Sequence, residues 1–402
     1  CDWSSDVCSS DLAVIGLGSM ALNQITPYSD LEFAIITENN AYKDNPETLD
    51  YFRNLSHLVH LKVITLGESK LFRSSDGIDL SHIIQAGVRF DSGGKTPLGR
   101  IEGDKPYDLI GTQEELFWYV KNEGNKAEHI DKNLPYILEN VTYISGNPTL
   151  VNQYQDAITA FLPELYTGED QKYIGMLNYQ VRALKVLQEG AVEYNYSPGI
   201  NKPITMQMKG ELQKLQPDFA ETAGILFEVK QEIYRLLDRM IYNLGMCFGI
   251  KGDSAWDTID SLKEKGIISQ EAVKNLKQAV NFATMLRLKT YSHYGYQKEK
   301  FSPKESDKLD VSTEIFCLTK EELAEDGELF KFFYSMFALT EQLQKYCNQE
   351  QGWNQTEREQ FFVNESFFAN DAEHKATVHY RLMRYEEFIK CELEYLNELK
   401  KQ

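Results

Sequence analysis

Short apolar runs, separated by Gly, Pro, Asn and Asp, fill the chain up to about residue 150. Apolar runs of this length between turn-forming residues predict strands. Between the first two runs, Asn45 is placed to cap a helix with Pro46 at its first position and Asp50–Leu61 as its body. This mixture predicts an α/β segment whose strands are Leu31–Ile36, Leu61–Leu66, Ala86–Phe90 and Glu139–Ile144.

Beyond about residue 150 the apolar residues recur every three or four positions, which predicts helices. Thr319 and Glu322 form a capping-box pattern ahead of one of them. The helical faces are formed by Ile225, Leu226, Val229, Ile233, Leu236, Leu237, Met240, Ile241 and Leu244, by Val273, Leu276, Val280, Ala283 and Leu286, and by Phe388, Ile389, Leu393 and Leu396. The expected fold class is α+β, with a mixed domain over residues 13–150 and an all-helical domain over residues 151–402.

The first twelve residues do not resemble natural protein sequence. CDWSSDVCSSDL resembles the translated read-through of a sequencing adapter, and such segments are set aside in fold reasoning. We expect the protein's own sequence to begin at Ala13.

Charge and cysteine content narrow the class of protein. The net charge of −19 becomes −16 without Asp2, Asp6 and Asp11, so most of the surface would repel a nucleic-acid backbone. General nucleic-acid binding is therefore not expected. The chain could still bind nucleotides if metal ions screen the carboxylates of the binding site. The cysteines beyond residue 12 are widely spaced, which argues against structural zinc and favours a reducing, cytoplasmic compartment. No apolar run reaches eighteen residues, so no membrane span is expected.

The most informative pattern is a Gly-Ser pair followed by two acidic residues. Gly18 and Ser19 are followed, after ten residues, by Asp30 and Glu32 at the start of the first predicted strand. Alternate residues of a strand share a face, so the two carboxylates are expected to project together while the apolar residues between them face the core. Paired carboxylates repel each other unless a cation lies between them, and Mg²⁺ prefers such oxygen ligands.

Gly-Ser, the spacer and Asp-x-Glu together resemble the signature of the polymerase-β-like nucleotidyltransferase superfamily. GSMA and TPYSDLEFAI more narrowly resemble putative nucleotidyltransferases related to the N-terminal domain of PII-protein uridylyltransferase. NFATMLRLKTYSHYG (Asn281–Gly295) is similar to the helical segment after that domain.

The resemblance implies transfer of a nucleoside monophosphate from a nucleoside triphosphate to an acceptor hydroxyl, with Mg²⁺ or Mn²⁺. Asp30 and Glu32 would hold the metals, and Gly18 and Ser19 would position the triphosphate. The uridylyltransferase relatives and the acidic charge favour a protein over a nucleic acid as the acceptor.

Several positions depart from the family pattern. Leu22, Asn23 and Gln24 stand where relatives usually carry Arg, Gly and Glu, and Asn140 stands where many supply a third carboxylate. Glu139 is expected on the opposite face of that strand. Asp91 is the other candidate for a third metal ligand. The alternative hypothesis is therefore a catalytically impaired module of the same fold that senses nucleotides or binds proteins.

Two further glycine patterns resemble other nucleotide-binding motifs but are incomplete. Gly16–Ala21 matches G-x-G-x-x-A, but Pro27 interrupts the short gap before the next strand and leaves no room for a Rossmann crossover helix. Gly93–Thr96 resembles the end of a P-loop, yet the first glycine is missing and Pro97 follows directly. Lys95 remains a candidate phosphate contact.

Two histidine patterns have structural explanations that we favour. Arg287 and His293 have the spacing of HEPN ribonucleases, a weaker alternative function, but a packing or ion-pair arginine and a surface histidine are the more common case. His57 and His60 lie three residues apart on the first predicted helix, where surface histidines are more common than a metal site.

Overall fold

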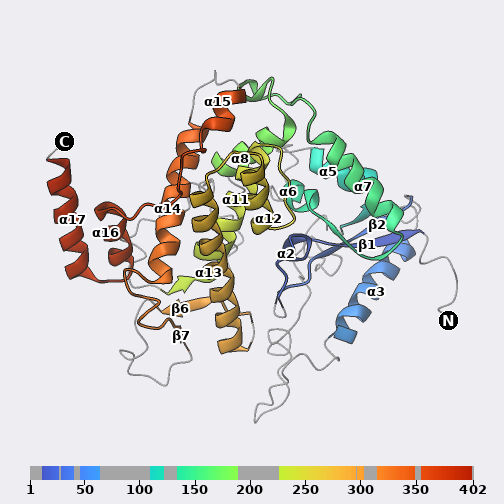
Figure 1. Cartoon of the computed structure of the whole chain (residues 1–402). Helices are drawn as coiled ribbons and strands as arrows, with labels where there is room; N and C mark the ends of the chain where they lie inside the picture. Colours follow the sequence, from blue (N-terminus) through green and yellow to red (C-terminus); the bar gives the residue numbers. More distant parts are fainter. Residues whose placement is uncertain are drawn as a thin grey trace, which may run out of the picture. The chain divides into compact units, whose positions relative to one another are not determined.

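The computed structural model describes nine stretches of the chain, which fall into two units (Figure 1). The first unit is Cys1–Glu164 with Gly295–Gln297, and the second is Leu165–Tyr294 with Lys298–Gln402. The described stretches are residues 11–26, 29–39, 46–63, 109–121, 134–188, 226–295, 297–302, 315–348 and 355–400.

A four-stranded mixed sheet organises the first unit. Its order is β3-β2-β1-β4, with β1 antiparallel to both neighbours and β2 parallel to β3. The strands are β1 (Leu12–Gly16), β2 (Phe33–Thr37), β3 (Ile110–Thr112) and β4 (Thr142–Gly146).

Both faces of β2 are buried, while β1 has one buried and one half-buried face. On one face Phe33 and Ile35 cluster with Ile110. On the other face Ala34 and Ile36 are buried, and helices α5 (Gln113–Lys121) and α7 (Pro148–Phe161) pack against this part of the sheet. Burial on two faces explains why β2 is a continuous apolar run without polar alternation.

Two helices of the first unit begin at residues that favour a helix start. α3 (Pro46–Val63) has proline at its first position, as expected from the sequence. Asn147 caps α7, because its Oδ1 accepts the Thr149 N–H at 3.0 Å. Among the described residues of this unit, the other helices are α2 (Gly18–Ala21) and α6 (Leu134–Glu139).

The structure corrects the predicted strands at two places. Leu61–Val63 continue α3, so the strand predicted at Leu61–Leu66 is wrong over those residues; the apolar run extends the helix. The predicted strand Glu139–Ile144 moves to Thr142–Gly146, because Glu139 ends α6 and the Asn140 N–H closes a turn onto the Ile137 carbonyl. Ala86–Phe90 lies outside the described residues.

The central strand β1 was not predicted. It includes Leu12, which pairs with Thr37, and the Asp11 carbonyl accepts the Glu38 N–H at 2.9 Å. Both Asp11 and Leu12 belong to the segment that resembles adapter read-through. β1 was missed because it is only five residues long and begins in a segment that was set aside, so too little of its apolar pattern remained to predict a strand.

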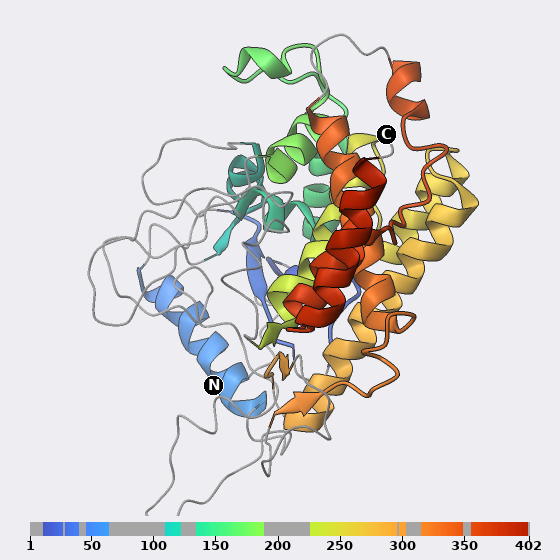
Figure 2. The same ribbon diagram turned by 90° about the vertical axis from the view of Figure 1, so that its left-hand side faces the viewer.

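Helices dominate the second unit (Figure 2). α11 packs against α8 and α12, α13 packs against α14, and α16 packs against α17. Their bounds are α8 (Asn178–Gln188), α11 (Arg235–Cys247), α12 (Ala255–Glu264), α13 (Gln270–Tyr294), α14 (Glu328–Cys347), α15 (Gln355–Gln360), α16 (Ala372–Arg381) and α17 (Tyr385–Leu399).

A small sheet corrects the prediction that this half is entirely helical. β5 (Phe227–Glu228), β6 (Lys300–Ser302) and β7 (Phe316–Cys317) form it in that order. The long helix predicted from Ile225 therefore begins later, with a π-helical turn at Val229–Tyr234 that leads into α11. Phe227 belongs to the sheet rather than the helix because its ring stacks on the Phe301 ring, with 4.5 Å between the ring centres.

The capping box at Thr319 and Glu322 forms, but it closes a turn rather than opening a helix. Glu322 Oε2 accepts the Thr319 N–H at 2.9 Å, and Thr319 Oγ1 accepts the Glu322 N–H at 3.2 Å. The next helix, α14, begins only at Glu328. None of the described helices combines the length and apolar character needed to cross a membrane.

Gly146 offers a test of the β1–β4 register. Its φ is +90°, and a Cβ would overlap the Leu12 carbonyl oxygen. Gly175 has nearly the same φ, +85°, but a Cβ there would have no atom within 4 Å. We expect Gly146→Ala to lower the free energy of unfolding of its unit by about 2–4 kcal/mol, and Gly175→Ala by about 1–2 kcal/mol. Urea unfolding measures both, and equal losses would contradict the close approach of β4 to Leu12.

Candidate functional site

The Gly-Ser pair lies in a tight turn at the end of β1. Gly18 has a φ of +55°, a conformation that glycine adopts at little cost. The preceding Leu17 N–H donates to the Glu32 carbonyl at 2.9 Å, which extends the β1–β2 pairing by one residue. The turn is therefore attached to the segment that carries the acidic pair.

The carboxylate of Glu32 lies directly against Gly18. A Cβ on Gly18 would overlap Glu32 Oε2, so only glycine leaves the carboxylate in this position. Two separate parts of the sequence pattern, the glycine turn and the acidic pair, are thus brought into contact. The positive φ favours glycine here, and a Cβ at this position would displace the end of the Glu32 side chain.

The three residues that depart from the family pattern close this turn. The Leu22 N–H donates to the Gly18 carbonyl at 3.2 Å, and the Gln24 N–H donates to the Ser19 carbonyl at 2.8 Å. Asn23 has a φ of +53°, a conformation that asparagine tolerates better than most residues. Leu22, Asn23 and Gln24 therefore have a backbone role in shaping the turn.

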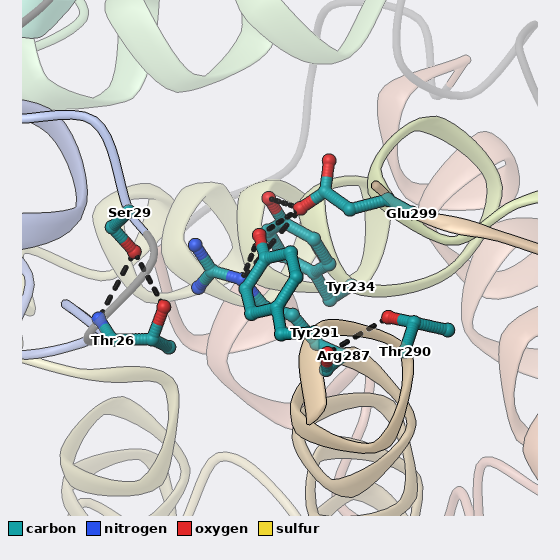
Figure 3. Close-up of polar contacts among 7 residues, drawn as sticks. All are labelled: Thr26, Ser29, Tyr234, Arg287, Thr290, Tyr291 and Glu299. Atoms are coloured by element: carbon teal, nitrogen blue, oxygen red, sulfur yellow. Dashed lines mark hydrogen bonds and ion pairs between the residues drawn. The ribbon is translucent and has the colours of Figure 1, made fainter. Parts of the chain in front are cut away.

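A second turn precedes Asp30. The Thr26 N–H donates to Ser29 Oγ at 2.9 Å, and the two hydroxyl oxygens lie 2.9 Å apart (Figure 3). The Ser29 N–H also donates to the Thr26 carbonyl at 3.0 Å. Ser29 is buried. Asp30 follows directly and is half-buried, so a fixed turn holds the start of the acidic segment.

The acidic pair lies just before the regular strand. β2 begins at Phe33, so Asp30 and Glu32 occupy the segment that leads into it rather than the strand itself. Both are half-buried. A carboxylate pair held partly away from water beside a backbone turn can present oxygen atoms to a cation.

The predicted third position lies at the same end of the sheet. Thr142, the first residue of β4, pairs with Gly16, the last residue of β1. Asn140 precedes Thr142 by two residues and lies in the turn after α6. The prediction that Glu139 lies on the opposite face of the strand is wrong, because Glu139 is the buried last residue of α6.

Two other predicted site residues, Asp91 and Lys95, lie outside the described residues. In the stretches that the structure does describe, no three His, Cys, Asp or Glu side chains gather as a complete metal site. The oxygen donors of Asp30 and Glu32 nevertheless match the preference of Mg²⁺ and Mn²⁺ for hard ligands.

A buried polar network in the second unit surrounds Arg287. Its Nε donates to the Tyr291 hydroxyl at 3.0 Å and lies 3.8 Å from Glu299 Oε1. Tyr291 and Tyr234 both donate to the same Glu299 oxygen, and the guanidinium carbon lies 4.3 Å from the centre of the Tyr234 ring (Figure 3). Burial raises the pKa of both tyrosine hydroxyls. Sequence reasoning missed Glu299, because no local pattern marks it.

His57 and His293 are exposed, as we favoured, whereas His60 is half-buried. His293 is exposed, and its ring lies 4.8 Å from that of Tyr294 and 5.5 Å from that of Phe316. On α3, His57 is exposed, while burial and then the charge of His57 lower the pKa of His60. The ion pair of Arg287 supports its packing role over the ribonuclease hypothesis.

Comparisons with known proteins add no family assignment. No protein-family model matches the chain, and no curated protein matches it.

The Arg287 network makes a prediction about stability. Glu299→Gln leaves a buried guanidinium without its counter-charge, so we expect the free energy of unfolding of the second unit to fall by about 3–5 kcal/mol. The control is Lys277→Met, which removes an ion pair to Asp260 of 2.6 Å that is partly open to solvent. That change should cost less than about 1 kcal/mol. Chemical denaturation measures both, and a small loss in Glu299→Gln would contradict a charged, buried pair.

Proposed function

We propose that the chain is a metal-dependent nucleotidyltransferase, which moves a nucleoside monophosphate from a nucleoside triphosphate to an acceptor hydroxyl. The observation that carries the proposal is the contact between the Glu32 carboxylate and Gly18. A glycine turn intended only to reverse the chain has no need of a carboxylate against it. A carboxylate at a phosphate-binding turn is what a metal-bridged triphosphate requires.

Each part of the turn has a separate task in this proposal. Gly18 leaves room for the Glu32 carboxylate beside the turn, because it has no side chain. Ser19 supplies a hydroxyl, and backbone N–H groups at the turn would add hydrogen-bond donors for the phosphates. These groups would orient the triphosphate so that its α-phosphorus faces the acceptor.

Asp30 and Glu32 would hold the metal ions. Mg²⁺ or Mn²⁺ bound there would neutralise charge on the phosphates and on the leaving pyrophosphate. The acceptor oxygen forms a bond to the α-phosphorus, the bond to the bridging oxygen breaks, and the hydroxyl proton passes to solvent.

A protein hydroxyl is the acceptor that we favour. The net charge of −19 opposes close approach of a nucleic-acid backbone. A protein acceptor imposes no such requirement. The resemblance to uridylyltransferase domains points the same way.

A second candidate is a nucleotide-sensing or protein-interaction module that has lost catalysis. Asn140 favours it, because an amide at the end of the sheet beside β1 neither neutralises a metal nor accepts a proton as a carboxylate does. Such a module binds nucleotide and transfers nothing.

Label transfer tests the enzyme. The full chain is incubated with each α-labelled nucleoside triphosphate, Mg²⁺ or Mn²⁺, and a cell lysate as the source of acceptors. We expect label on protein, and a loss on the order of 10²–10³-fold in Asp30→Asn/Glu32→Gln. The control is Glu38→Gln, an exposed carboxylate just beyond the other end of β2, which should retain transfer.

Two outcomes of this experiment would contradict the proposal in different ways. Nucleotide binding without label transfer, with any triphosphate, would favour the sensing module. Transfer that persists in the double variant would contradict the assigned carboxylates.

Gly18 and Gly16 form a matched pair for the geometry of the turn. Gly18→Ala places a methyl group where Glu32 Oε2 lies, so we expect transfer to fall by about 10²-fold or more. Gly16→Ala meets the Met20 side chain and, at 3.0 Å, Thr142 Cγ2, but it leaves the Glu32 carboxylate in place. Initial rates measure both, and equal activity of the two variants would show that the carboxylate position does not matter.

A further inference from the structure

Two histidines of α16 lie at the boundary between this helix and α14. The His379 ring lies 5.0 Å from that of Phe330, and the His374 ring lies 5.4 Å from that of Phe337. Residues seven apart share one side of a helix, so the two phenylalanines face the same way on α14. The imidazoles therefore meet α14 about two turns apart, along the boundary where the two helices pack together (Figure 1).

Each histidine also contacts a carboxylate outside α16. His379 Nε2 lies 3.0 Å from Glu325 Oε1, in the turn before α14. His374 Nε2 lies 2.9 Å from Glu341 Oε1, on α14 itself. Histidine is the side chain that ordinarily changes charge between about pH 5 and 8. Both polar contacts therefore involve a side chain whose protonation can alter them.

The second ring nitrogen distinguishes the two histidines. Nδ1 of His374 lies 2.7 Å from Asp371 Oδ2, so each nitrogen of that ring faces a carboxylate. Nδ1 of His379 is buried and has no hydrogen-bond partner within the described part of the chain. A proton added to His374 therefore finds an acceptor, whereas a proton added to Nδ1 of His379 finds none.

The contact with Glu325 fixes the tautomer of His379. A carboxylate only accepts, so Nε2 carries the hydrogen that faces Glu325 and Nδ1 is bare. The side chain of His379 is only 1% exposed. Protonation would thus create a charged N–H at Nδ1 with neither water nor an acceptor beside it, which is costly in a protein interior. Tyr334, on α14, flanks the same Phe330 ring and stays neutral because burial raises its pKa.

Charged groups around His379 act in both directions, and burial outweighs them. Burial lowers the pKa of His379, while Glu325, from the turn before α14, opposes that shift. Arg384, the residue before α17, also lowers the pKa, and Glu387 on α17 raises it. A histidine whose pKa is lowered by folding stabilises the packed state above its ordinary pKa of about 6.5, and this contribution is lost as the pH falls below that value.

We propose that His379 is a pH-sensitive latch, which holds α16 against α14 while its ring is neutral and loosens this boundary when Nδ1 is protonated. α17 follows α16, because the Phe388 ring lies 5.0 Å from that of Tyr380 where the two helices pack together. Arg381 also attaches α16, to Glu232 at 3.2 Å, but a guanidinium stays charged throughout this pH range. The response to pH therefore belongs to the histidine.

Hydrogen exchange of the full chain, followed by mass spectrometry between pH 7.5 and 5.5, tests the latch. Rates are corrected for the intrinsic pH dependence of amide exchange. We expect the opening constant of α16 to rise several-fold as the pH falls, with about 10-fold as the ceiling set by an ordinary histidine pKa. The amides of α11 should open less often than those of α16 at each pH, because loosening of the boundary does not require the whole unit to unfold.

His379→Gln and His374→Gln form a matched pair. His379→Gln keeps an N–H donor for Glu325 but does not titrate, so the rise on acidification should disappear. His374→Gln should retain the rise, because it leaves Nδ1 of His379 bare and buried. Comparing each variant with itself at the two pH values removes any uniform loss of stability. An opening constant that does not rise in the unsubstituted chain, an undiminished rise in His379→Gln, or equal opening of α16 and α11 throughout would overturn the proposal.

Discussion

The contact between the Glu32 carboxylate and Gly18 is the constraint on which the first unit's site depends. It requires glycine at one position, a left-handed backbone there, and pairing of β1 with the segment that enters β2. The sheet provides that pairing because β1 buries Ala13 and Ile15 on one face, so a one-residue slip of β1 would carry them to its half-buried face. Packing of the core thus fixes the position of a polar group at its edge.

The second unit uses its buried charges differently. Arg287, Glu299 and two tyrosines form a closed set of hydrogen bonds between α13, the π-helical turn and the approach to β6. Satisfied networks of this kind hold elements in one arrangement, and they cost stability when a member is lost. Arg287 has the spacing to His293 that is typical of HEPN ribonucleases, but in the core it instead contacts Glu299 and Tyr291. Spacing alone does not distinguish a catalytic arginine from a packed one.

Local chemistry was the most predictable part of the fold. Pro46 marks the start of α3, and the period of apolar residues marks α13. The Gly-Ser turn and the acidic pair, which meet where Glu32 contacts Gly18, were recognisable as one pattern. Long-range partners were not predictable: Phe227 joins β6 through the Phe301 ring, and Glu299 meets Arg287, without any local signal. Apolar periodicity also predicted α17 but not that part of its apolar face would meet solvent.

The central claim is that Asp30 and Glu32 bind metal together with nucleotide. Electron paramagnetic resonance of Mn²⁺, titrated into the full chain with a non-hydrolysable nucleoside triphosphate, tests it without knowledge of the acceptor. The account predicts about two bound Mn²⁺ per chain that depend on nucleotide, and their loss in Asp30→Asn/Glu32→Gln but not in Glu38→Gln. Nucleotide-dependent Mn²⁺ binding that is unchanged in the double variant would contradict it.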